Sequence, residues 1–133
     1  MRVSDLMQAD LETVSPDTPV NDVFVTLAES RVSALPVVDG AGRLIGVISR
    51  TDIVASEEDA EGEAARAALF ETTLVRDLMT SPALTIAADA SIRDSARQML
   101  STGVHRLFVV SDQHAIGVIS VTDILAAVAD GRL

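Results

Sequence analysis

Residues 46–53 read GVISRTDI and residues 117–124 read GVISVTDI, so seven of eight positions are identical at an offset of 71. Upstream, the DLM of residues 5–7 recurs at residues 77–79, at an offset of 72. The change of offset indicates that one residue has been lost in the turn ahead of Gly117. A sequence doubled in this way predicts two similar folded halves and, where the halves meet, two similar clefts.

The composition limits the function classes to which the chain can belong. Its 133 residues carry a formal net charge of −10, and so acidic a chain repels nucleic acids and anionic membrane surfaces. Cysteine is absent, which excludes disulfides, thiolate metal sites and cysteine nucleophiles. Because 48% of the residues are hydrophobic but none is Trp or Tyr, we expect an aliphatic core. No apolar run follows Arg2 or reaches membrane-spanning length, so a cytoplasmic protein is expected.

The first half predicts helices and strands in a definite order. A helical turn is expected at residues 4–7 and an extended stretch at residues 13–14. Thr18 and Pro19 suit the start of a helix, as N-cap and first helical residue. Apolar residues at helical spacing then share one face of that helix: Val20, Val23, Phe24 and Leu27. A strand, a glycine turn, a second strand and a second helix follow at residues 34–38, 39–42, 44–49 and from 50 or 51 onward.

The second half repeats this order. An apolar stripe predicts a helix that ends near Gly103, and the stripe consists of Ile92, Ala96, Met99 and Leu100. Two strands and a final helix follow at residues 106–110, 115–120 and 121–129.

These elements predict an α/β fold of two β-α-β-β-α repeats. Since each half alone is too small to cover both faces of its strands, we expect the two sheets to pack together with the helices outside. A pseudo-twofold axis would relate the repeats. The repeats would span residues 1–55 and 74–133. An acidic and alanine-rich linker, compatible in part with a helix, would join them at residues 56–73, and its charges are typical of a solvated segment.

The repeated block places polar residues where a strand ends and a helix begins. These residues are Ser49, Thr51 and Asp52 in the first half and Ser120, Thr122 and Asp123 in the second. The first N–H groups of a helix lack internal partners and bind phosphates. The hydroxyls could add donors to a phosphate, and the carboxylates could accept hydrogen bonds from ribose hydroxyls. The mixture indicates a nucleotide site, but Ser and Asp at a helix start are also typical of plain capping, so both interpretations stand.

Several motifs together resemble a known family. The tandem DLM openings, the ALPVVD of residues 34–39 and the doubled GVIS blocks are similar to a pair of cystathionine-β-synthase (CBS) domains, also called a Bateman module. The resemblance covers nearly the whole chain apart from residues 56–73. Residues 31–39, 104–107 and 120–125 are especially similar to the last two repeats of the regulatory gamma subunit of AMP-activated protein kinase.

The resemblance implies a ligand and the residues that would bind it. Such pairs bind AMP, ADP, ATP or sometimes S-adenosylmethionine in clefts between the repeats. In one cleft Asp123 would hold the ribose hydroxyls, Ser120 and Thr122 would approach ribose or phosphate, and His105 and Arg106 would meet the phosphates. Adenine would lie against Val32, Ser33, Ala34 and Ile119, and residues 7–12 would line the same cleft. The mirrored cleft would use Ser49, Thr51, Asp52 and Val104.

The two implied clefts are not equivalent. His105-Arg106 is matched in the first repeat by Ser33-Ala34, so a basic pair is expected only in the Asp123 cleft. Arginine binds phosphate through charge-assisted and often bidentate hydrogen bonds, and we therefore expect the Asp123 cleft to be the tighter one. A histidine flanked by apolar strand residues is also typical of a structural role, and this alternative stays open for His105.

The expected function is that of a non-enzymatic regulatory module that senses an adenosine nucleotide. The family implies a homodimer, for which the apolar helix residues Ile124, Leu125 and Val128 could supply the contact. With no second domain evident in the sequence, the output would pass through a partner protein or self-association. The alternative is a module whose clefts stay empty and whose fold serves only to dimerise or dock.

Other chemistries fit the sequence poorly. The GAGRLIG of residues 40–46 only faintly resembles a dinucleotide fingerprint, because it joins two strands instead of a strand and a helix. His105 and His114 lack zinc-helix spacing, so no metal is expected. Ser49 and Ser120 have no evident histidine base, so neither a catalytic residue nor a required cofactor is expected.

Overall fold

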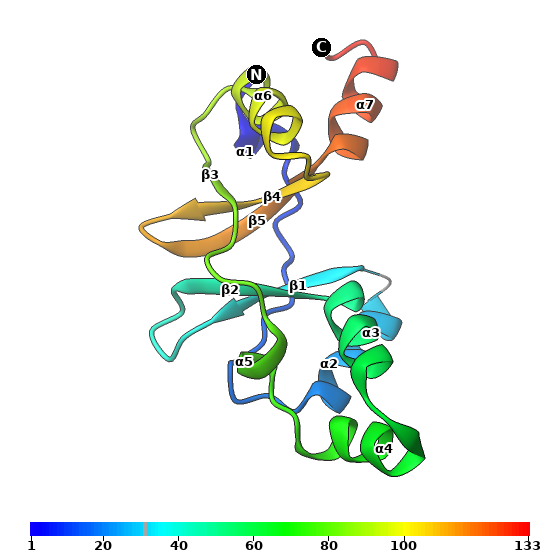
Figure 1. The fold of residues 1–133 in the computed structure, drawn as a ribbon. Coiled ribbons are helices and arrows are strands. Elements are labelled where there is room, and N and C mark those ends of the chain that lie inside the picture. Colours follow the sequence, from blue (N-terminus) through cyan, green and yellow to red (C-terminus); the bar gives the residue numbers. More distant parts are fainter. Residues whose placement is uncertain (31) are drawn as a thin grey trace. The chain divides into compact units, whose positions relative to one another are not determined.

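The computed structural model describes residues 1–30 and 32–133, and Figure 1 shows its ribbon. Arg31, the first residue of the family-like stretch 31–39, lies outside the described residues, as do the side chains of Asp59, Leu69 and Phe70. The chain divides into two compact units. Unit 1 consists of Met1–Leu11 with Leu84–Leu133, and unit 2 consists of Glu12–Ala83.

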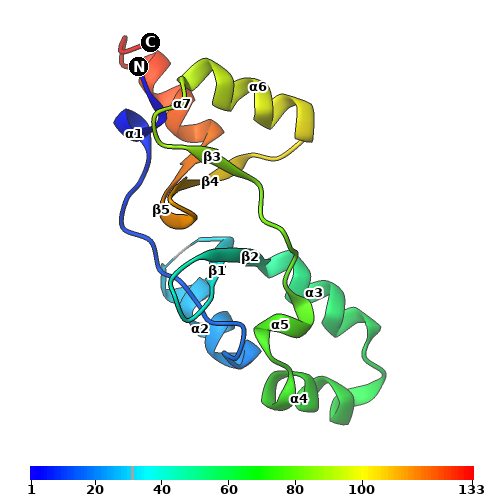
Figure 2. The ribbon, with the colours of Figure 1, turned by 90° about the vertical axis from the view of Figure 1, so that its left-hand side faces the viewer.

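Unit 1 is built on a three-stranded sheet. Strand β3 (Thr85–Ala87) pairs in parallel with β4 (Arg106–Ser111), which pairs antiparallel with β5 (His114–Ser120). Three helices lie on one side of this sheet in Figures 1 and 2: α1 (Val3–Leu6), α6 (Ile92–Thr102) and α7 (Val121–Ala129). Leu107 and Ile119, both fully buried, belong to the aliphatic core that sheet and helices enclose.

Unit 2 is built on the antiparallel pair β1 (Ala34–Val38) and β2 (Leu44–Ser49). Val14 forms a parallel bridge to Val37, in the place that β3 takes beside β4 in unit 1. The helices of this unit are α2 (Val20–Ser30), α3 (Arg50–Asp59), α4 (Gly62–Thr72) and α5 (Val75–Leu78). Its aliphatic core includes Leu35 and Ile48.

The opening segment of each repeat belongs to the unit of the other repeat. Val3 is fully buried in the core of unit 1, and its N–H donates to the Ala90 carbonyl at 2.8 Å. Val75, which is 72 residues further on, is fully buried in the core of unit 2 and donates in the same way to the Thr18 carbonyl at 2.9 Å. The units of packing therefore differ in extent from the repeats of the sequence.

The hairpin turns account for the lost residue. Between β1 and β2, the partners nearest the turn are Val38 and Leu44, whereas Val110 pairs with Ala115 between β4 and β5. The shorter turn passes through Asp112 and Gln113, whose φ angles are 50° and 69°. Two consecutive positive φ values are typical of a tight two-residue hairpin, because that turn matches the twist of its strands.

The predicted fold class and most of the predicted elements are confirmed. Strands β1 and β2 and helix α7 have the predicted bounds, and Gly103 ends α6 in the left-handed conformation with φ 73°. Within residues 1–30 and 32–133, no helix is both long and apolar enough to cross a membrane.

Three details differ from the prediction. Helix α2 begins at Val20, because the Thr18 hydroxyl accepts the N–H of Ser15 and so closes a turn ahead of the helix. Phe24 and Leu100, predicted for the apolar stripes, are 43% and 84% exposed. Each stripe is wider than the strip of helix surface that its own sheet covers, so its outer residues stay in solvent.

Candidate functional site

Both polar blocks form capping boxes at the start of a helix. At α7, the Ser120 hydroxyl accepts the N–H of Asp123 at 3.1 Å, and the Asp123 carboxylate accepts the N–H of Ser120 at 2.8 Å. At α3, Ser49 and Asp52 make the same two bonds at 3.1 and 2.9 Å. The capping interpretation is therefore confirmed for both blocks. It leaves room for a ligand, since a carboxylate has about four acceptor positions.

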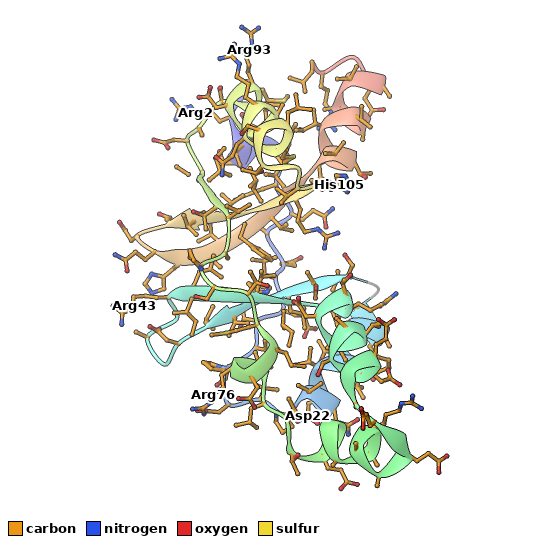
Figure 3. The ribbon with its side chains drawn as sticks, viewed as in Figure 1. Arg2, Asp22, Arg43, Arg76, Arg93 and His105 are labelled. Atoms are coloured by element: carbon orange, nitrogen blue, oxygen red, sulfur yellow. The ribbon has the colours of Figure 1, made fainter. Side chains whose placement is uncertain are left out.

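Arg106 lies beside the Asp123 capping box. It is the direct cross-strand partner of Ser120, so the two side chains extend from the same face of neighbouring strands. The carbonyl of the preceding residue, His105, accepts the N–H of Val121 at 3.0 Å. Figure 3 shows His105 close to where α7 begins. Two basic side chains thus flank the N-terminus of α7, where the helix dipole also favours an anion.

Unit 2 has the same backbone geometry with different side chains. Ala34 is the cross-strand partner of Ser49, and the Ser33 carbonyl accepts the N–H of Arg50 at 2.9 Å. The repeats therefore place Arg106 and Ala34 in equivalent positions beside equivalent capping boxes. The sequence predicted a basic pair beside only one of the two capping boxes, and the structure shows that the backbones around the two boxes have the same local geometry.

Gln8 adds a contact to Asp123 that the sequence did not predict. Its backbone pairs with Val118 on β5 through two hydrogen bonds of 2.9 Å, and its side-chain Nε2 donates to Asp123 Oδ1 at 3.1 Å. The residue falls within the segment 7–12 that the family resemblance had marked. A comparison of the repeats could have drawn attention to Gln8. The equivalent residue 72 positions later is Thr80, and the two side chains differ in length and chemistry.

Glycines allow these segments to cross the strands closely. A Cβ at Gly117 would lie 2.7 Å from the Sδ of Met7 and 2.9 Å from the carbonyl oxygen of Gln8. At Gly46, the equivalent glycine of the first repeat, the nearest atom to a Cβ would be the Thr80 carbonyl oxygen at 2.8 Å. Only glycine fits such an approach without a shift of the neighbouring backbone.

The predicted site residues divide between the two units. Unit 1 contains Val104, His105, Arg106, Ile119, Ser120, Thr122 and Asp123, and unit 2 contains Val32, Ser33, Ala34, Ser49, Thr51 and Asp52. Ile119 is fully buried in the core of unit 1, whereas His105, Thr122 and Val32 are exposed. Each predicted cleft draws residues from both units, and that combination stays a prediction.

Metal ligands do not gather in the described part of the chain. Within residues 1–30 and 32–133, no three or more His, Cys, Asp or Glu side chains are placed to hold a metal ion together.

The model of the CBS domain matches residues 3–59 and 75–130, and the chain belongs to this family. The resemblance that the repeated motifs indicated is thereby confirmed.

Relatives with longer chains share this pair. An inosine-5′-monophosphate dehydrogenase of Methanocaldococcus jannaschii is 30% identical over 93% of this chain, and the gamma-3 subunit of human 5′-AMP-activated protein kinase is 30% identical over 89%. The chain spans only 23% and 24% of the length of these two proteins.

A solved structure matches the chain almost from end to end. It is that of CBSX2 in complex with AMP, a protein known from Arabidopsis thaliana. Its sequence is 31% identical, the TM-score is 0.83, and the match covers 99% of this chain and 98% of the other.

Proposed function

We propose that the chain is a non-enzymatic regulatory module that binds an adenosine nucleotide (AMP, ADP or ATP), with S-adenosylmethionine as a further candidate. The observation that carries this proposal is the end-to-end likeness to CBSX2, whose structure was solved in complex with AMP. No catalytic residue, metal or cofactor is part of the proposal. Its chemistry is reversible binding, which shifts the protein between states that differ in affinity for the nucleotide.

The chemistry around Asp123 supports this ligand class. The Asp123 carboxylate has acceptor positions beyond those used by the cap, which suit ribose hydroxyls. The N-terminus of α7 and the Arg106 guanidinium supply positive charge for phosphates, and His105 could add a hydrogen bond beside them. In the proposed cleft, Thr122 lies near ribose or phosphate, and adenine contacts Val32, Ser33 and Ala34. Ile119 is fully buried in the core of unit 1, so it can only support this wall from behind.

A second, weaker cleft is part of the proposal. It would use Ser49, Thr51, Asp52 and Val104, and it lacks an arginine in the position of Arg106 because Ala34 stands there. Losing one charge-assisted contact costs about 1.5–3 kcal/mol, or about 10- to 150-fold in affinity. The proposal therefore has one nucleotide bound more tightly than the other.

We also propose that two copies associate through α6 and α7. An apolar groove lies between these helices, and its lining residues include Met99, Leu100, Val104, Ile124 and Leu125. Leu125 and Val128 on α7 are 61% and 54% exposed in the single chain. An isologous contact would cover the same surface on both copies and remove these side chains from water. The proposal also includes a partner protein, whose binding the nucleotide would regulate, and a cytoplasmic location.

The second candidate function is a module that dimerises or docks with its clefts empty. The exposed apolar groove favours this candidate, because a large exposed apolar surface is typical of a protein-binding site, and docking through the groove requires no nucleotide. Nucleic acids and membranes are not proposed as partners of either candidate, since the net charge of −10 opposes both.

Calorimetric titration separates the two candidates. AMP, ATP and S-adenosylmethionine are titrated separately into the whole chain, and the unfolding midpoint is measured with and without each compound. Nucleotide binding predicts heat and a raised midpoint with at least one of the three, since a ligand of the native state stabilises it. Absence of both effects with all three compounds, in a chain that still sediments as a dimer, would favour the docking module.

A further inference from the structure

The backbone of Gln8 is fixed to a strand, while its side chain extends into solvent beside Asp123. Two backbone hydrogen bonds of 2.9 Å fix it to Val118 at the edge of β5, while the side chain is exposed. The carboxamide reaches Asp123, 115 residues away in sequence, and donates from Nε2 to Oδ1. An ionised carboxylate only accepts, so the NH₂ group must face it, and the carboxamide oxygen Oε1 must be the other end.

Counting acceptors around Asp123 shows what Gln8 contributes. Oδ2 accepts both the N–H and the hydroxyl of Ser120, at 2.8 and 2.9 Å, which uses its two lone pairs. Oδ1 accepts from Gln8, which leaves one lone pair. While Gln8 donates to it, Asp123 therefore offers one acceptor, whereas a ribose diol brings two donors. Among the described residues none donates to Oε1 of Gln8, so that this oxygen is the second acceptor beside Asp123.

We propose that Gln8 is a specificity residue of the Asp123 site, where its carboxamide oxygen accepts one of the two vicinal hydroxyls of a ribose while Asp123 Oδ1 accepts the other. This inference rests on the proposed function, and it assigns to a particular pair of atoms the preference for a ribose over a deoxyribose. A site that is built to bind a hydroxyl rejects the analogue without it, because its acceptor is left without a donor.

The other repeat provides a natural comparison. Thr80 makes the same backbone bridge to Val47, through bonds of 2.8 and 2.9 Å, and so stands where Gln8 stands in unit 1. A threonine side chain is shorter and has no carboxamide. The pair of ribose acceptors, Gln8 Oε1 and Asp123 Oδ1, therefore occurs in the Asp123 site and is not repeated at Asp52.

The test is a calorimetric titration with AMP, 2′-deoxy-AMP and 3′-deoxy-AMP. Three variants are compared with the unchanged chain. Gln8→Thr installs the residue of the other repeat, Gln8→Met keeps the length without the amide, and Thr80→Val is the matched control. Both Gln8 variants are expected to weaken AMP about 2- to 10-fold, the range of one neutral hydrogen bond. They should not weaken the deoxy analogue that lacks the hydroxyl bound by Gln8, so the preference for AMP over that analogue falls. Thr80→Val should leave the affinities of the Asp123 site for AMP and for the deoxy analogues unchanged.

Three outcomes would overturn the inference, and they differ in what else they affect. If AMP binds the unchanged chain, and both Gln8 variants keep its affinity and its preference over the deoxy analogues, Gln8 does not contact the ribose, while the proposed function stands. Tighter AMP binding by Gln8→Met would show that the carboxamide competes with the ligand for Asp123. If AMP, ATP and S-adenosylmethionine all fail to bind the unchanged chain, the proposed function fails together with this inference. Unfolding midpoints establish that each variant is folded.

Discussion

The Asp52 and Asp123 blocks share a backbone and differ in the side chains around it. Each is a capping box at a strand-to-helix junction, each has a glycine that lets a crossing segment approach, and each segment bridges the strand through two backbone bonds. Unit 1 adds Arg106 and Gln8 where unit 2 has Ala34 and Thr80. The duplicated backbone provides two possible sites, and side chains outside the duplicated block distinguish them.

Truncating equivalent core leucines gives the largest expected effect on stability. Leu35 and Leu107 are 2% and 0% exposed, and each lies in the core of its own unit. Leu35→Ala and Leu107→Ala should each lower the free energy of unfolding by about 2–5 kcal/mol, because each leaves a cavity. Urea unfolding measures the loss. Hydrogen exchange should accelerate first in the unit that carries the substitution, and equal acceleration in both units by both variants would show that the cores are not separate.

Removing Arg106 should produce the largest loss of nucleotide affinity. Arg106→Ala takes away a charge-assisted phosphate contact and should weaken AMP at the tighter cleft by about 10- to 150-fold. Titration of AMP measures the change, and Arg43→Ala is the control, because Arg43 lies in the β1–β2 turn of unit 2, bonded to Asp39. Unchanged affinity in Arg106→Ala, or two equal sites in the unchanged chain, would remove the proposed difference between the clefts.

The crossing glycines test how the segment around Gln8 is positioned. Gly117→Ala and Gly46→Ala each force a Cβ to within 2.9 Å of a backbone oxygen, and each should cost about 1–3 kcal/mol in stability. Only Gly117→Ala displaces Gln8, so only this variant should also weaken AMP at the Asp123 site. If Gly46→Ala weakened AMP to the same degree, the loss would reflect stability alone.

The smallest expected effect concerns the longer hairpin turn, which unit 1 lacks. The backbone N–H of Arg43, helped by that of Ala41 and by the Arg43 guanidinium, lowers the pKa of Asp39. A carboxyl whose pKa is lowered in the folded state stabilises it at neutral pH, and this contribution is lost as the pH falls through that pKa. Asp39→Asn should therefore lower the unfolding midpoint slightly at pH 7 and by a smaller amount at pH 3. An equal difference at both values would contradict this account.

The sequence predicted most of the fold because local signals agree with packing. Alternating and helical spacing, the glycines of the first turn and Gly103 predicted most strands and helices to within a residue or two. Helix α3 is an exception, because it continues to Asp59, into the segment 56–73 that was predicted as a linker. The exchange of Val3 and Val75 between the units was not predicted, because an apolar residue in a short helix does not indicate which core it enters. Phe24 and Leu100 share the predicted apolar stripes by spacing but are exposed, since apolar character alone does not distinguish a core face from an exposed one.

The candidate site was predicted less completely than the fold. Asp123 and Ser120 were identified from the doubled block, and pairing with Ser120 places Arg106 beside them. The bond from Gln8 depends on a crossing segment 115 residues away, and no local pattern encodes it. The grouping of unit 1 and unit 2 residues into two clefts remains a prediction that binding measurements must test.

The central claim is that Asp123 holds the ribose of an adenosine nucleotide, and one matched pair of variants tests it most directly. AMP is titrated into Asp123→Asn and Asp52→Asn, which alter equivalent capping boxes and so carry a similar structural cost. The account predicts that Asp123→Asn abolishes the tighter binding event, while Asp52→Asn retains it. Tight AMP binding that survives in Asp123→Asn at the affinity of the unchanged chain would contradict the claim.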